Sequence, residues 1–336
     1  MYRKFQDSPN VNWFKTKTKK EKNFPSVIKT FMGRDAINLL LFNKKKESKK
    51  ALLPAYTCTE VTDQFEKHGY KIVYYDLNFF EIEELPQTTD IDIFYFIRYF
   101  GIEVKNIKSA IKKVKKQNPN IFIVEDRAHY LSDKPLLKDV DAYIFSFRKL
   151  LPTPEGGGLL TDIKIDYRYK SKFISNLLSL AMVLKKRFIG HNPKFSRSKI
   201  ASENSLSNAI FAPSFFTNRV IENFDIDKNI KLRRELFYLW LEKSKKYSIK
   251  PLFTKLQEDD IPQGFPIIVS DANKLFVKMR KEGVYLKRHW ILDEKFKTIA
   301  PKSYKLSNEI ITLPIYEEIN EKDIDMIIDK IHLYTI

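Results

Sequence analysis

The first 160 residues alternate between two periodicities, and this alternation limits the possible folds more than any other feature. Apolar residues at helical spacing predict three helices, and short β-branched or aromatic runs predict five strands. The helices are expected at 35–42, 59–69 and 106–117, and the strands at 50–56, 71–77, 92–100, 120–126 and 141–147. Strands that alternate with helices form a mostly parallel sheet covered on both faces. We therefore expect an α/β fold with a mostly parallel central sheet flanked by helices.

A second, smaller region follows. Residues 163–225 are irregular and include a predicted helix with an apolar stripe and basic ends at 171–190. Beyond them we expect helices at 227–246, 271–283 and 321–333, and strands at 264–270 and 310–316. This pattern predicts two domains: a large one over 1–225 and a smaller α+β C-terminal domain over 226–336.

Charge and cysteine content bound the partners and the compartment. The net charge of +18 suits nucleic acid or anionic lipid, but the lysines are scattered. No zinc-finger spacing, RNA-binding aromatic signature or basic-zipper heptad accompanies them, so we expect no nucleic-acid partner and assign no metal ligands. A single cysteine, Cys58, excludes a disulfide framework and favours the cytoplasm.

No segment has the length of a membrane span. The longest apolar run, 176–184, is far shorter than the ~20 residues that spanning requires, and the first 20 residues have no apolar signal-peptide core. The basic ends of the 171–190 helix leave peripheral membrane contact as an alternative. We favour packing of this helix on the body or on a partner subunit.

Lys149 lies in an apolar stretch directly after a predicted buried strand, beside Arg148. A charged side chain is seldom buried unless it is paired or takes part in chemistry. Burial, or a neighbouring cation such as Arg148, lowers the pKa of a lysine amine and frees it to form a Schiff base. Pyridoxal phosphate is a cofactor that needs such a lysine.

Other segments carry the groups that this cofactor needs. Asp126 ends a predicted strand, where open α/β sheets bind ligands, and its carboxylate can keep the ring nitrogen protonated. His129 can donate to the phenolate oxygen of the ring. Gly33 precedes an apolar helix whose first N–H groups can bind the phosphate, and Ser146 adds a hydroxyl. The glycines at 156–158 allow backbone to approach backbone beside the lysine.

Ser146 and Lys149 also form a Ser-x-x-Lys pair, as in serine β-lactamases and penicillin-binding proteins. Those sites need a Lys-Thr-Gly strand, which this sequence lacks, and the α/β alternation argues against them. The order of the segments favours the cofactor lysine instead: a glycine-led helix start, then Asp-x-x-His, then Ser-x-x-Lys and glycines.

In this order the chain resembles the fold-type I pyridoxal-phosphate aminotransferases, specifically the DegT/DnrJ/EryC1/StrS group of sugar aminotransferases. The resemblance covers most of the chain. It is carried by FMGRDAINLLL (31–41), LLPAYTCTEVTDQFEKHGYKIVYYDLN (52–78), YFG (99–101), IVEDRAH (123–129), FSFRKLLPTPEGGGLLTD (145–162), EGVYLKRHW (282–290) and LPIYEEINEKDIDMIIDKI (313–331).

The resemblance implies a role for each site residue. Lys149 would be the catalytic lysine that binds the cofactor and shuttles protons, Asp126 would pair with the ring nitrogen, and His129 with the phenolate. Five further cofactor contacts are implied: Gly33, Arg34 and Ser146 at the phosphate, and Tyr56 and Cys58 near the ring face. The family often has an aromatic residue at the position of Cys58.

The implied activity is transfer of an amino group from an amino acid, with glutamate as the expected donor, to a keto or aldehyde acceptor. A sugar or sugar nucleotide in polysaccharide or glycoconjugate synthesis is the expected acceptor class. Arg148, Lys287, Arg288 and His289 are candidate contacts for a substrate phosphate or carboxylate, although an exposed basic turn would explain the last three equally well.

The resemblance also implies a homodimer with shared active sites. Residues 163–204 do not match the family's asparagine-containing loop that reaches the neighbouring subunit, and Asn204 and Asn208 are candidate substitutes.

Two alternatives remain open. One is another pyridoxal-phosphate reaction on the same fold, such as that of a lyase or racemase. The family's sugar dehydratases carry histidine in place of the lysine, so Lys149 argues against that branch. The other is a non-catalytic basic protein that binds nucleic acid or membrane, against which the joint presence of Lys149, Asp126 and His129 argues.

Overall fold

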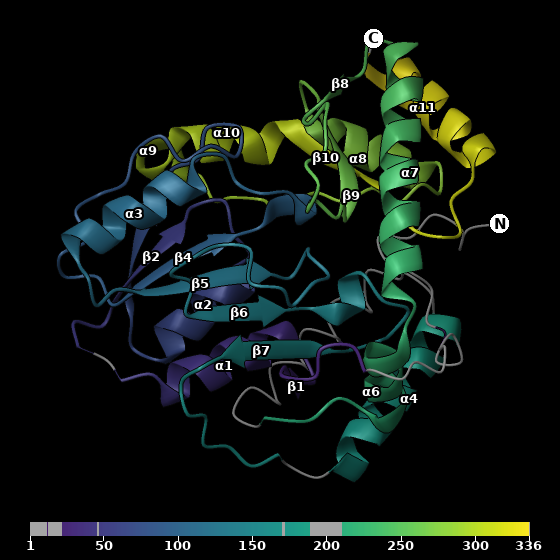
Figure 1. Cartoon of the computed structure of the whole chain (residues 1–336). Helices are drawn as coiled ribbons and strands as arrows, with labels where there is room; N and C mark the ends of the chain where they lie inside the picture. The colour runs from purple at the N-terminus through teal and green to yellow at the C-terminus, as the bar shows by residue number, and fades with distance from the viewer. Residues whose placement is uncertain (1–11, 13–21, 46, 170–171, 189–209, 336) are drawn as a thin grey trace.

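A seven-stranded sheet forms the centre of the larger part of the molecule (Figure 1). The computed structural model describes residues 12, 22–45, 47–169, 172–188 and 210–335. The strands, in spatial order, are β1 (Ile28–Thr30), β7 (Gly157–Thr161), β6 (Ala142–Phe145), β5 (Phe122–Arg127), β4 (Ile93–Ile97), β2 (Lys50–Pro54) and β3 (Lys71–Tyr75). The pairs from β6 to β3 are parallel, and β7 is antiparallel to both β6 and β1. The prediction of a mostly parallel sheet is confirmed.

Helices cover both faces of this sheet. The helices α1 (Gly33–Asn43) and α2 (Thr59–Lys67) pack together on one face, and α3 (Ile107–Gln117) lies on the other (Figure 1). The helical spacing of apolar residues explains this placement, because α3 buries Ile107, Ala110, Ile111 and Val114 along one stripe. A buried core rich in Leu, Ile and Phe fills the space between sheet and helices.

A smaller antiparallel sheet forms the C-terminal part, in the order β10 (Ile310–Pro314), β9 (Gly264–Ile268) and β8 (Lys250–Pro251). Three helices pack with it: α7 (Ile226–Lys245), α8 (Ala272–Lys281) and α11 (Glu321–Thr335). This part has its own buried cluster, in which Phe237 and Trp240 of α7 contact Phe265 of β9. The predicted α+β character of the C-terminal part is confirmed, whereas the boundary at residue 226 stays a prediction.

Several elements differ from the sequence prediction. Strand β7, which begins at Gly157 within the glycine run, was not among the predicted strands, and antiparallel neighbours on both sides satisfy its backbone. The strand predicted at 92–100 ends at Ile97, since Phe100 and Gly101 have positive φ and turn the chain. Elements without a sequence signal are β1, β8, α6 (Phe215–Asn223), α9 (Phe296–Ile299) and α10 (Pro301–Glu309).

The helix predicted at 171–190 is present as α4 (Lys172–Phe188). The candidate residues Asn204 and Asn208, predicted to reach the neighbouring subunit, lie outside the described residues. None of the described helices combines the length and the apolar composition that crossing a membrane requires.

Candidate active site

Lys149 and His129 meet at the carboxyl ends of two adjacent parallel strands. Lys149 lies in a single 3₁₀ turn after β6, and His129 follows β5 by two residues. The Nζ atom of Lys149 is 3.2 Å from Nε2 of His129. Strand β6 ends at Phe145 because this turn begins, and the turn directs the lysine to the end of the sheet where ligands bind.

Burial lowers the pKa of the Lys149 amine to about 8. The charge of Lys287 acts in the same direction, and Asp126 opposes it. Arg148, the neighbouring cation that the sequence suggested, contributes less than Lys287 does. The second cation at the lysine therefore comes from the C-terminal part of the chain, 138 positions away in sequence.

The Asp126 carboxylate is buried on β5 and accepts two hydrogen bonds. The hydroxyl of Tyr95 donates to Oδ2 at 2.7 Å, and the backbone N–H of Ala128 donates to Oδ1 at 2.7 Å. Burial raises the pKa of Asp126, while Lys149 and Tyr95 favour its ionised form. Tyr95 was not predicted as a site residue, because it lies on the adjacent strand β4 within an apolar run that gives no sign of a polar contact.

The ring of His129 is held from two sides. The backbone N–H of Phe100 donates to Nδ1 at 3.2 Å, so a neutral ring carries its hydrogen on Nε2, which faces Lys149. Burial lowers the pKa of His129 well below 6.5, and Lys149 adds to this effect. The ring of Trp290 stacks on that of His129, with the ring centroids 5.7 Å apart and an angle of 16° between the ring planes. A lone tryptophan far along the sequence carries no signal for this contact.

Glycines bring the start of α1 beside Ser146. A Cβ on Gly33 would lie 3.1 Å from the carbonyl oxygen of Phe145 and 3.3 Å from Cβ of Ser146. A Cβ on Gly157 would lie 2.2 Å from the carbonyl carbon and oxygen of Met32. The start of α1 therefore packs directly against β7 and Ser146, and this junction forms a cradle in which the predicted phosphate contacts Gly33 and Ser146 lie together.

Arg34 follows Gly33 in α1, and Cys58 directly precedes α2. The guanidinium of Arg34 pairs with Glu60 of α2 at 3.0 Å. Cys58 is the N-cap residue of α2 and is partly buried. Burial raises the pKa of its thiol, and the charge of Lys149 opposes this shift, which places the thiol within electrostatic reach of the lysine.

Tyr56 lies in an aromatic cluster at the edge of the site. Its ring centroid is 5.5 Å from that of Trp290, 5.8 Å from that of Tyr99 and 5.5 Å from that of Phe80. The ring is fully buried, and its hydroxyl has no hydrogen-bond partner among the residues that the structure describes. The cluster closes one side of the site with apolar ring faces.

The predicted substrate contacts in KRHW (287–290) take different positions, and Lys287 is the one whose charge acts on Lys149. His289 is buried, its ring centroid is 4.9 Å from that of His129, and its Nδ1 is 3.1 Å from Oγ1 of Thr312. Arg288 instead donates to Oδ1 of Asn273 at 2.9 Å and to the carbonyl of Ser307 at 3.1 Å. The structure therefore brings His289 to the lysine, and a substrate role for Arg288 stays a prediction.

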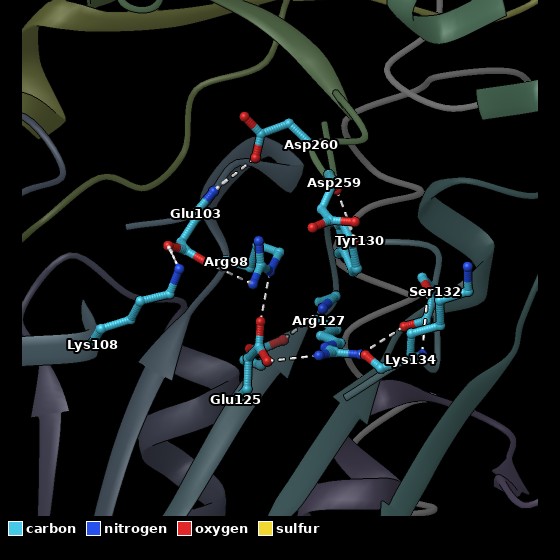
Figure 2. Close-up of polar contacts among 12 residues, drawn as sticks. Arg98, Glu103, Lys108, Glu125, Arg127, Tyr130, Ser132, Lys134, Asp259 and Asp260 are labelled. Carbon is cyan, nitrogen blue, oxygen red and sulfur yellow. Dashed lines mark hydrogen bonds and ion pairs between the residues drawn. The ribbon is translucent and has the colours of Figure 1, made fainter. Parts of the chain in front are cut away.

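A buried charge network supports the strand that carries Asp126 (Figure 2). Glu125 accepts from Nε of Arg98 at 2.6 Å and from Arg127 at 2.9 Å, and all three side chains are buried. Both guanidinium groups lie over the ring of Tyr130, whose hydroxyl donates to the carbonyl of Asp259. The network ties the end of β5 to the segment that leads into β9.

Metal binding finds no support in the parts of the chain that the structure describes, because no three His, Cys, Asp or Glu side chains there are placed to hold an ion.

The lysine, the buried aspartate, the histidine and the glycine-lined helix start lie at one end of a mostly parallel sheet, and a small antiparallel domain follows. This architecture is the fold of the fold-type I pyridoxal-phosphate aminotransferases. The resemblance to the DegT/DnrJ/EryC1/StrS group is thereby confirmed at the level of the fold.

Solved structures of that group superpose on nearly the whole chain. PseC of Helicobacter pylori, an aminotransferase involved in pseudoaminic acid biosynthesis, matches with a TM-score of 0.68 and 16% identity over 98% of this chain and 99% of its own. The putative sugar aminotransferase Spr1654 of Streptococcus pneumoniae, in its pyridoxal-phosphate form, matches with a TM-score of 0.65 and 16% identity over 93% of this chain and 87% of its own. A DegT/DnrJ/EryC1/StrS aminotransferase of Brucella abortus matches with a TM-score of 0.61 and 15% identity over 92% of this chain and 86% of its own. No protein-family model and no curated protein sequence matches the chain.

Proposed function

We propose that this protein is a pyridoxal-phosphate-dependent aminotransferase. It moves an amino group from an amino acid, with glutamate as the donor, to a ketone or aldehyde of a sugar or sugar nucleotide. The observation that carries the proposal is the environment of Lys149: a partly buried amine with a pKa of about 8, in contact with His129 and in the field of a buried Asp126. A purely structural lysine gains nothing from such surroundings.

The residues of the site fit the cofactor. Pyridoxal phosphate, when bound, supplies an aldehyde that takes up amines and a ring that withdraws electrons from them. Gly33, Ser146 and the start of α1 would hold its phosphate, and Asp126, oriented by Tyr95, would keep a proton on the ring nitrogen. His129 would donate to the phenolate oxygen from Nε2.

Lys149 has the second role of moving a proton. With a pKa of about 8, a usable fraction of its amine is neutral near neutral pH and can accept a proton from the α-carbon of the substrate. The protonated Nζ can then return that proton to a different carbon. His129, buried and neutral, does not compete for the proton.

Absorption spectroscopy tests the assignment. Purified protein mixed with pyridoxal phosphate is expected to show a visible band, and borohydride reduction followed by mass spectrometry is expected to place the cofactor on Lys149. Lys149→Ala should lose both signals, and Lys164→Ala, which changes an exposed lysine of the same domain, should keep them. A band that survives in Lys149→Ala would refute the assignment.

Reaction with glutamate separates transamination from other chemistries. Transamination converts glutamate to 2-oxoglutarate and leaves the cofactor in its amine form, in equal amounts. Loss of the visible band with stoichiometric 2-oxoglutarate supports the proposal. A cofactor that binds without forming 2-oxoglutarate from any amino donor favours the lyase or racemase alternative.

We also propose a homodimer. Phe173 and Leu177 of α4 and Phe215 of α6 are exposed, and the two helices are joined by a hydrogen bond from the backbone of Phe215 to Asn176. Contiguous exposed apolar side chains are typical of subunit contacts. Light scattering should give a dimer for the wild type and a monomer for a Leu177→Glu, Phe215→Glu double variant. The control Phe42→Glu alters an exposed phenylalanine on α1 and should stay dimeric.

A further inference from the structure

A pocket lies beside Lys149 on the side of the smaller sheet, and its lining includes neither Gly33 nor Ser146. Its polar lining consists of Lys149, Gln263, Tyr285, Lys287, Thr312 and Tyr316. Apart from Lys149, all of these come from the C-terminal part of the chain. The pocket is therefore built where the two parts of the molecule meet at the reactive amine.

The backbone of the smaller sheet places Lys287 and Gln263 on opposite sides of β10. Lys287 exchanges two backbone hydrogen bonds with Thr312, at 3.2 and 2.8 Å. Gln263 directly precedes Gly264 of β9, which pairs with Pro314 of β10. The backbone N–H of Gln263 donates to the carbonyl of Phe100 at 2.8 Å. A Cβ on Gly264 would lie 2.4 Å from the side chain of Thr312, so the glycine allows this close packing.

The charge of the pocket is one-sided. Two lysines line it, and none of the lining residues is an aspartate or glutamate. The charge of Lys287 acts on Lys149, His129 and His289 and lowers the pKa of each. Both amines would attract an anion in the pocket, and the anion would be bound more tightly there than on an exposed lysine.

Gln263 adds a directional feature. The residue is 5% exposed, and within the described part of the chain its carboxamide oxygen has no hydrogen-bond partner. A buried acceptor without a donor costs about 1–3 kcal/mol. A ligand that donates a hydroxyl or amine hydrogen to this oxygen removes that cost, which a bare anion does not do.

We propose that Lys287 and Gln263 form a substrate subsite beside Lys149, in which Lys287 pairs with an anionic group and Gln263 accepts a hydrogen bond from a hydroxyl or amine next to it. That the ligand is a substrate rests on the proposed function. An amino acid carboxylate and a sugar phosphate both have this chemistry. Lys287 and Gln263 are assigned to specificity, and Lys149 alone to proton transfer.

Calorimetry with non-reacting probes tests the subsite. The protein, with and without added pyridoxal phosphate, is titrated with succinate, malate and inorganic phosphate. Lys287→Glu is expected to weaken binding of at least one probe by tenfold or more, and Lys287→Arg to restore it to within threefold. Lys281→Glu, which makes the same charge change at an exposed position on α8, should have little effect. Circular dichroism checks that each variant is folded.

Malate tests Gln263, because it differs from succinate by one hydroxyl. The wild type should bind malate more tightly than succinate, and Gln263→Leu should lose that preference while it still binds succinate. Dependence on Lys287 for succinate but not for phosphate assigns the subsite to a carboxylate, and the reverse assigns it to a phosphate. Phosphate bound equally by the wild type and Lys287→Glu lies elsewhere.

The inference is overturned if no probe binds, if Lys287→Glu binds every probe as the wild type does, or if Lys281→Glu weakens binding equally. These titrations need no turnover. Binding that depends on Lys287 in a protein that fails to form 2-oxoglutarate would refute the proposed function and leave the subsite standing. Transamination that is unaffected by Lys287→Glu would refute the subsite alone.

Discussion

Gly157→Ala tests whether close backbone approach builds the cradle at the start of α1. Gly157 is paired with Thr30 in β1, so β7 cannot move away without breaking that pairing. An added Cβ would lie 2.2 Å from the carbonyl carbon and oxygen of Met32 and 2.5 Å from the nitrogen of Gly33. Ordinary contacts begin near 3.4 Å, so the start of α1 must shift by about 1 Å.

The expected cost follows from the atoms involved. Overpacking costs about 1–3 kcal/mol when side chains can yield, and here only backbone can yield. We therefore expect a loss near the upper limit, about 3 kcal/mol, or roughly 100-fold in the folding equilibrium. Gly69→Ala is the control, because no atom lies within 4 Å of its added Cβ and the residue has a φ of +77°. That change carries only the left-handed backbone cost of about 1–2 kcal/mol.

Urea unfolding followed by circular dichroism measures both variants, and fluorescence titration measures their affinity for pyridoxal phosphate. Gly157→Ala should have the lower unfolding midpoint and at least about tenfold weaker cofactor binding, since a 1 Å displacement spoils the placement of the phosphate. Gly69→Ala should bind the cofactor as the wild type does. A Gly157→Ala protein as stable as Gly69→Ala would refute the steric reasoning, and a destabilised one with unchanged cofactor affinity would refute the cradle.

Three further changes probe the charges of the site. Lys149→Met should be more stable than the wild type at pH 7 by up to about 3 kcal/mol, with the advantage shrinking between pH 8 and 10.5. The reason is that between these pH values the lysine is protonated in the unfolded chain but neutral in the folded wild type. Urea unfolding midpoints measured across this pH range test the prediction, and a stability difference between variant and wild type that does not change with pH would contradict it. Glu125→Leu leaves the buried Arg127 without a carboxylate partner and Arg98 with only its 3.7 Å pair to Glu103, so it should cost about 3–5 kcal/mol in thermal unfolding. Glu103→Ala, which removes only that partly exposed pair, should cost less than about 1 kcal/mol, and equal losses would argue against the network. Tyr95→Phe removes a hydrogen bond to a charged acceptor and should weaken pyridoxal-phosphate binding about tenfold by fluorescence, so an unchanged affinity would exclude a role for Tyr95 in orienting the carboxylate of Asp126.

Much of the candidate site could be predicted from the sequence, because its residues lie next to short, recognisable patterns. Asp126, His129 and Lys149 each follow or end a recognisable apolar strand, and parallel strands place their carboxyl ends at one edge. The glycine-led start of α1 was equally visible, since a glycine before an apolar-periodic helix is a short-range pattern. The order of these segments was enough to predict the α/β class and the position of the site.

The C-terminal contributions were not visible in that way. Lys287 was a predicted substrate contact, but no local pattern around Lys287, Trp290 or Gln263 indicates that these residues lie near Lys149, from which they are more than 100 positions away in sequence. Tyr95 was hidden for a different reason: its partner Asp126 lies on an adjacent strand, and pairing register is set by the packed sheet.

By itself, the sequence determined the alternation of strands and helices, the lysine and its carboxylate, and the end of the sheet at which they meet, because each depends on periodicity and on residue types close together in the chain. Only the tertiary structure decided that Lys287 lowers the pKa of Lys149 more than Arg148 does, and that Gly157 allows β7 to pack closely against the start of α1. Electrostatic and steric effects depend on distance through space, and the packing of segments that are distant in sequence sets those distances.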